Sequence, residues 1–240
     1  MLKKLFGLLI IAQLMVGCTT AELQSALETV LSEDTPLSSA EVASGLKEAL
    51  NIGIGKGADR LSQKDGYFKS TYKILLPEEA REVTDKLQNI PGFSEVENIL
   101  LEKINRGAED AAKKAKPIFV DAIKSMTFND AMNILMGDKN AATQYLNQST
   151  YNSLYREFNP VIVESLDKFN ARKYWSDAVN TYNKIPFVDK VNADLDDYIT
   201  KEALNGLFGM VEKEERNIRQ NISARTSDLL KKVFAKQDGN

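Results

Sequence analysis

The chain has 240 residues, a net charge of −3 and 43% hydrophobic residues, a composition typical of a folded protein with a substantial core. Acidic and basic residues are mixed along the sequence, which argues against the concentrated basic face that a nucleic-acid-binding protein needs. There is no histidine, which excludes Ser-His-Asp and Cys-His catalysis and every histidine metal site. No metal or cofactor motif is present, and we expect neither group.

The first residues are typical of a bacterial lipoprotein precursor. Two lysines precede an apolar run that is shorter than the roughly 20 residues needed to span a bilayer. The run leads into Leu14-Met15-Val16-Gly17-Cys18, which resembles a lipobox, and Cys18 is the only cysteine in the chain. We therefore predict a signal peptide over residues 1–17 and a lipid on the Cys18 sulfur. The alternative is a soluble secreted protein with an incidental cysteine.

The predicted lipid also predicts a location. The residue after Cys18 is Thr19 and not aspartate, which by the sorting rule of enteric bacteria indicates the inner leaflet of the outer membrane, facing the periplasm. Residues 18–36 are expected to form the lipidated N-terminus with a tether and a first helix, and residues 37–237 a helical domain. The expected partners are the membrane, through the lipid anchor, and another envelope protein or a small anionic ligand; nucleic acid is not expected.

Apolar residues recur at helical spacing along most of the chain. The spacing predicts a first helix over residues 20–33. Ser38 and Glu41 fit a capping box at the start of the next helix. Three glycines between residues 53 and 57 then interrupt the pattern. Their spacing fits neither common phosphate-binding fingerprint, so close helix packing or a kink is the preferred interpretation.

The segment 65–77 is the one place where the pattern allows a short extended hairpin, because it is rich in aromatic and branched residues and ends at a proline. The remaining sequence is helical in pattern. Helices are predicted from Pro77 to a stop near Pro91, over residues 94–116, from Pro117, and from a start at 127–130 to a stop at 137–138. Further helices are predicted over 139–148, 151–170 and 171–184, and over 194–236 with a break near 221–223. We therefore predict an all-α fold, a single irregular multi-helix bundle.

Polar residues interrupt these helices in several clusters, and they provide the candidate site residues. One hypothesis brings the arginines and carboxylates of two clusters together in a cleft, where the arginines would grip a carboxylate or phosphate. The alternatives are surface ion pairs and helix caps, or a buried ionic network that fixes helix register. No catalytic residue is assigned. The candidates for a ligand-binding or structural polar cluster are Asn105, Arg106, Glu109, Asp130, Asp138, Glu215, Arg219 and Arg225.

Four stretches in this order and spacing resemble the bacterial lipoprotein-like family catalogued as Domain of Unknown Function 4197. They are Asn105–Glu109, Met126–Ala131, Ile134–Leu146 and Ala224–Phe234. The resemblance covers nearly all of the chain after residue 36. It implies a helical periplasmic protein and no particular activity.

Two hypotheses about function follow. The first is a lipid-anchored helical module of the envelope that acts by binding or as a scaffold. The second is an enzyme that uses carboxylates without histidine and acts on an envelope glycan or lipid. The enzyme would need two carboxylates facing each other within roughly 5–10 Å in an open cleft.

Overall fold

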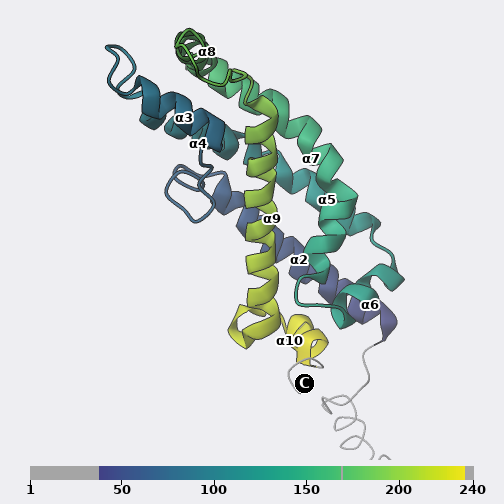
Figure 1. Ribbon diagram of the computed structural model, residues 1–240. Helices are drawn as coiled ribbons and strands as arrows, with labels where there is room; N and C mark the ends of the chain where they lie inside the picture. Colours follow the sequence, from purple (N-terminus) through teal and green to yellow (C-terminus); the bar gives the residue numbers. More distant parts are fainter. Residues whose placement is uncertain (1–37, 169, 236–240) are drawn as a thin grey trace, which may run out of the picture. The chain divides into compact units, whose positions relative to one another are not determined.

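A computed structural model describes residues 38–168 and 170–235 (Figure 1). The predicted signal peptide, Cys18 and the predicted first helix at 20–33 lie outside the described residues. The described part is helical and contains no strand, which confirms the all-α prediction. Its elements are α2 (Ser39–Leu61), α3 (Glu78–Leu87), α4 (Val96–Ala112), α5 (Ala115–Ser125), α6 (Phe128–Met136), α7 (Ala141–Lys168), α8 (Ala171–Tyr182), α9 (Asp196–Gln220), the 3-10 helix η2 (Ile222–Ala224) and α10 (Asp228–Ala235).

Four long helices, α2, α4, α7 and α9, form the centre of the bundle. Helix α7 packs against both α4 and α9, and α9 packs against α2. In the view of Figure 1, α9 lies in front of α2 and crosses it. Helices α3 and α8 cover α4, while α5, α6 and α10 cover α2. The largest fully buried side chains include Trp175, Tyr67, Phe119 and Phe158, so aromatic residues fill the spaces between these layers.

Helix α2 runs without a break through the three glycines that interrupt its sequence pattern. A Cβ atom at Gly53 would lie 3.0 Å from the Cδ1 of Ile218, and one at Gly57 would lie 3.0 Å from the Cγ of Met210. The missing side chains let α9 approach α2 closely. Packing between the two helices therefore offsets the roughly 1 kcal/mol by which each glycine weakens a helix relative to alanine.

Helix α7 is one continuous helix where two were predicted, and it contains Pro160. A proline inside a helix removes one backbone hydrogen bond and normally kinks or ends it. Phe158 and Ile162 flank the proline and are both fully buried. Core packing on both sides of Pro160 therefore accounts for a helix that continues through it.

The extended hairpin allowed at 65–77 is absent, because this segment is a series of turns followed by extended chain without a strand partner. The Asn105 side chain takes the place of that partner. Its Oδ1 accepts from the backbone N–H of Ile74 at 2.8 Å, and its Nδ2 donates to the Ile74 carbonyl at 2.9 Å. One buried amide on α4 thus satisfies both backbone groups that a neighbouring strand would have paired.

Two helices begin at capping boxes. At α2, the Ser38 hydroxyl accepts from the Glu41 N–H at 3.3 Å and the Glu41 carboxylate accepts from the Ser38 N–H at 2.8 Å, as the sequence predicts. Thr127 and Asp130 form the same reciprocal pair at the start of α6. Hydrogen bonds from Thr127 hold the pKa of Asp130 below its usual value.

Candidate functional site

Arg106 and Glu109 join helix α4 to the loop at 62–77. Glu109 is almost completely buried, and its Oε1 accepts from the backbone N–H groups of Tyr67 and Phe68, both at 3.2 Å. Arg106 donates to Glu109 at 2.8 Å and to Asp65 at 2.7 Å. The hydrogen bond from Arg106 lowers the pKa of Asp65. This cluster fixes the shape of the loop.

Two tyrosines of the same loop attach it to α9. Tyr67 donates its hydroxyl to the carbonyl of Ala203 at 2.7 Å, and Tyr72 donates to the carbonyl of Gly209 at 3.3 Å. Burial raises the pKa of both tyrosines, so both stay protonated and remain donors. Together with Glu109, these contacts hold the loop between α4 and α9.

A second cluster lies near the end of α9 and connects it to the α6–α7 corner. Glu215 accepts from the backbone N–H groups of Ala142 at 3.0 Å and Thr143 at 2.8 Å, in the first turn of α7. Arg219 pairs with Glu215 at 2.9 Å and donates to the carbonyl of Ile134, in the last turn of α6, at 2.7 Å. The acid thus lies at a helix N-terminus and the base at a helix C-terminus, as the helix dipole favours.

The remaining three candidates have separate surroundings. The buried Arg225 donates to the carbonyls of Ile218 at 3.1 Å and Arg219 at 3.0 Å, which are orphan acceptors at the end of α9. Asp130 belongs to the cap of α6. Asp138 is exposed in the turn between α6 and α7.

The arginines and carboxylates of the two clusters do not share one cleft. The first cluster reaches α9 at Ala203 through Tyr67, whereas Glu215 lies three turns further along α9. At 1.5 Å per residue the two positions are on the order of 18 Å apart along the helix axis. Each cluster instead serves backbone groups of a neighbouring segment, which matches the structural alternative.

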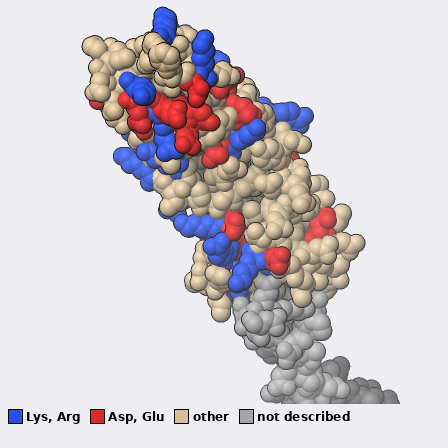
Figure 2. Space-filling view, in the orientation of Figure 1, with Lys and Arg blue, Asp and Glu red and all other residues tan. Residues whose placement is uncertain are grey.

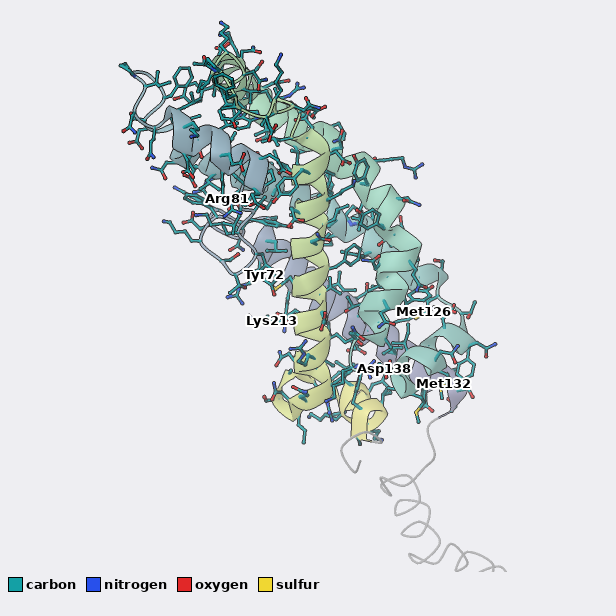
Figure 3. All side chains as sticks on the ribbon, viewed as in Figure 1. Tyr72, Arg81, Met126, Met132, Asp138 and Lys213 are labelled. Atoms are coloured by element: carbon teal, nitrogen blue, oxygen red, sulfur yellow. The ribbon has the colours of Figure 1, made fainter. Side chains whose placement is uncertain are left out.

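A hollow lies beside the first cluster, between the C-terminal end of α2, the loop and α9. It has a volume of about 560 Å³. Tyr72 and Lys213 lie on the same side of α9, as Figure 3 shows, and both line this cavity. Its full lining is Arg60, Gln63, Lys64, Asp65, Gly66, Lys69, Ser70, Thr71, Tyr72, Met210 and Lys213.

The charge of this lining is strongly positive. It includes four cationic side chains, from Arg60, Lys64, Lys69 and Lys213, and one carboxylate, Asp65. The carboxylate already pairs with Arg106 at 2.7 Å and with Lys69 at 3.3 Å. Arg60, Lys64 and Lys213 form no ion pair with any residue that the structure describes. We call this lining the basic cavity.

Local backbone geometry sets the cavity floor. Asp65 has a positive φ of 69°, and a Cβ atom on the following Gly66 would lie 2.5 Å from the carbonyl oxygens of Arg60 and Leu61. Only glycine lets the chain fold back so closely onto the end of α2. This tight return brings Lys64 and Lys69 to the same hollow as Arg60.

Sequence patterns did not identify the basic cavity. Arg60, Lys64 and Lys69 lie within ten residues around a turn signal, which is the one local indication of a basic site. Lys213 belongs to a helix far away in the sequence, and no local pattern places it there. Acidic and basic residues are mixed along the chain, so the sequence does not reveal the positive charge that collects at this cavity. Figure 2 shows that charged side chains gather in places on the folded surface and leave much of the viewed face uncharged.

A second hollow of about 440 Å³ lies between the start of α3 and the segment at 189–195, and four of its five charged lining residues are acidic. Glu78 and Glu79 occupy the first turn of α3, where they complement the helix dipole. Within residues 38–168 and 170–235, no three potential metal-ligating side chains come together. In the same ranges no helix is both long and apolar enough to cross a bilayer.

In the part of the chain that the structure describes, fold and cavity define an all-helical domain with a basic hollow, and the sequence has no histidine. The chain matches the family described as Protein of unknown function (DUF4197) over residues 36–235 and therefore belongs to this family. Searches of curated proteins and of solved structures found no match.

Proposed function

We propose that this protein is a lipid-anchored binding module of the bacterial envelope, and that it holds an anionic ligand in the basic cavity. The observation that carries the proposal is the set of four cations, from three segments of the chain, around a hollow with a single and already paired carboxylate. Ligand sites of small molecules commonly have volumes of about 300–1,000 Å³, and the cavity falls in this range.

Structural needs do not account for this arrangement. The cation of Arg60 complements the C-terminal dipole of α2, but one charge suffices for that purpose. Lys64 and Lys213 bring two more positive charges to the same hollow without an ion pair to any described residue. Like charges repel one another, so their gathering costs free energy that a bound anion would recover.

The predicted effect of charge reversal tests the cavity. The double variant Lys64→Glu with Lys213→Glu should weaken anion binding roughly a hundredfold, because each reversal replaces an attraction by a repulsion at close range. Its stability should stay within about 0.5 kcal/mol of the parent, since both side chains are exposed and neither forms an ion pair with a described residue. Calorimetry with phosphate, pyrophosphate, citrate and a phosphate monoester measures the affinities.

The matched control reverses Lys86 and Lys139, two exposed lysines outside the cavity, and changes the net charge by the same amount. It should bind as the parent does. If both double variants lose the same amount of anion affinity, the change in net charge explains the loss and the cavity does not. If none of the anions binds the parent protein at millimolar concentration, the proposed binding function is wrong.

The anchor rests on the lipobox at residues 14–18 and the single cysteine. Cys18→Ser removes the only thiol that can take a lipid. We expect the variant to lose labelling by a radioactive fatty acid and to leave the membrane fraction, because acyl burial at about 0.8 kcal/mol per methylene supplies the attachment. A parent protein that stays with membranes without any fatty-acid label contradicts the anchor.

A further inference from the structure

The composition of the basic cavity narrows the class of anion. We infer that the cavity binds a phosphate monoester, through a dianionic phosphoryl group at the lysines and an organic group against the Tyr72 ring. This inference rests on the proposed anion-binding function and makes it specific.

The first argument is the number of charges. Four cations line the hollow, and Asp65, which Arg106 also holds, compensates one of them. A net charge of about +3 remains on the wall. A carboxylate or a sulfate ester, each with one negative charge, would leave most of it uncompensated. A phosphate monoester carries between about −1.5 and −2 at neutral pH and matches the wall better.

The second argument is the type of cation. Three of the four cations are lysines, and Arg60 is the only arginine. Carboxylate recognition favours the planar fork of arginine, which binds both carboxylate oxygens at once. An ammonium group acts as a point charge and is a common ligand for phosphate oxygens. Lys213 approaches from α9, while Lys64 and Lys69 approach from the loop, so the phosphoryl oxygens have donors from two walls.

The third argument is the apolar part of the lining. The Tyr72 ring lies among the cations, beside the almost completely buried Met210, and the Gly209 carbonyl accepts a hydrogen bond from the Tyr72 hydroxyl. The ring is therefore fixed in place as part of the wall. A hollow of about 560 Å³ is also much larger than inorganic phosphate requires. An organic group attached to the phosphoryl would cover this apolar surface and fill the remaining space.

Two sources present the same chemistry: a soluble phosphate ester and the phosphomonoester headgroup of a lipid. The experiment compares three soluble probes that share one ring, namely phenyl phosphate, phenyl sulfate and benzoate, with residues 18–240 carrying Cys18→Ser. A separate arm measures co-sedimentation with vesicles that contain phosphatidic acid or, as the control, phosphatidylglycerol, whose phosphate is a diester.

At pH 7.5 phenyl phosphate should bind at least tenfold more tightly than phenyl sulfate and benzoate. At pH 5.0 its advantage over phenyl sulfate should largely disappear, because the second phosphate proton binds with a pKa near 6. The charged groups that face the site are Arg60, Lys64, Lys69, Lys213 and Asp65, with Tyr72 beside them and Arg106, Glu212 and Glu214 nearby.

The direction of the pH effect separates the ligand from the protein. The hydrogen bond from Arg106 holds the pKa of Asp65 below its usual value, so Asp65 stays ionised across this range. Any loss of negative charge from the protein in acid would strengthen anion binding, which is the opposite of the expected change. A loss of phenyl phosphate affinity in acid therefore reports protonation of the phosphoryl group.

Each outcome decides the inference. Selective sedimentation with phosphatidic acid vesicles supports the inference and indicates that the ligand is a lipid headgroup. Binding of phenyl phosphate without sedimentation supports the inference and indicates a soluble phosphate ester. Equal affinity for the three probes, or an affinity for phenyl phosphate that does not change with pH, overturns the phosphomonoester inference and leaves the anion-binding proposal standing. Failure of all three probes, together with failure of phosphate, pyrophosphate and citrate, overturns both. The Lys64→Glu, Lys213→Glu variant should lose binding in both arms.

Discussion

Glu215→Ala should lower the free energy of unfolding by about 3–5 kcal/mol, because it takes the carboxylate away from the buried charge of Arg219. The Glu215 and Arg219 side chains are only 5% and 8% exposed, and they pair at 2.9 Å. The substitution also removes the acceptor for the N–H groups of Ala142 and Thr143. Urea denaturation of residues 18–240 carrying Cys18→Ser, followed by circular dichroism, measures the loss.

Glu212→Ala is the matched control on the same helix. Glu212 pairs with Arg216 at 2.6 Å, but both side chains are more than one-third exposed. Solvent screens such pairs, and their contribution is at most about 1 kcal/mol. If the two alanine variants lose the same small amount of stability, the buried network at the α6–α7 corner does not hold the fold as the geometry indicates.

Glu109→Ala is expected to cost about 2–4 kcal/mol and also to abolish anion binding. It leaves the N–H groups of Tyr67 and Phe68 without their acceptor in a buried site. Arg106 keeps Asp65 as a partner, so the cost is smaller than at Glu215. The loop that carries Lys64 and Lys69 loses its attachment to α4, and the basic cavity loses its shape. The two measurements are urea denaturation and calorimetry with phenyl phosphate.

The control for this prediction is Glu102→Ala. Glu102 also contacts Arg106, but at 3.7 Å and with a side chain that is 47% exposed. Its removal should change neither stability nor affinity appreciably. Retention of full anion affinity in a folded Glu109→Ala protein would show that the loop keeps its shape without the buried carboxylate.

Local signals predicted local features of this fold. The Ser38–Glu41 capping box and the break after α9 near residue 221 depend on neighbours within one helical turn, and both are present. The hairpin allowed at 65–77 failed for the opposite reason. Its sequence favours extended chain, but whether that chain pairs with a strand depends on Asn105, a residue 31 positions from Ile74.

The polar candidates show the same limit. Their positions in or beside well-patterned helices made them candidates, but their distant partners could not be inferred from helical spacing. Glu215 binds backbone groups 72 and 73 residues away, and Arg219 binds a carbonyl 85 residues away. The ion pairs Arg219–Glu215 and Arg106–Glu109 each lie within one helical turn, so helical spacing permits them. The basic cavity depends on a tertiary approach of Lys213 and had no complete local signal.

The contacts at the end of α9 have a consequence for how the protein opens. Through Glu215 and Arg219, one turn of this helix holds both the first amides of α7 and the last carbonyls of α6. The turn at 137–140 therefore cannot swing outward while α9 keeps its place. Fluctuations that expose the corner must release the C-terminal part as well, so these segments behave as one cooperative unit in hydrogen exchange, although they are distant in the sequence.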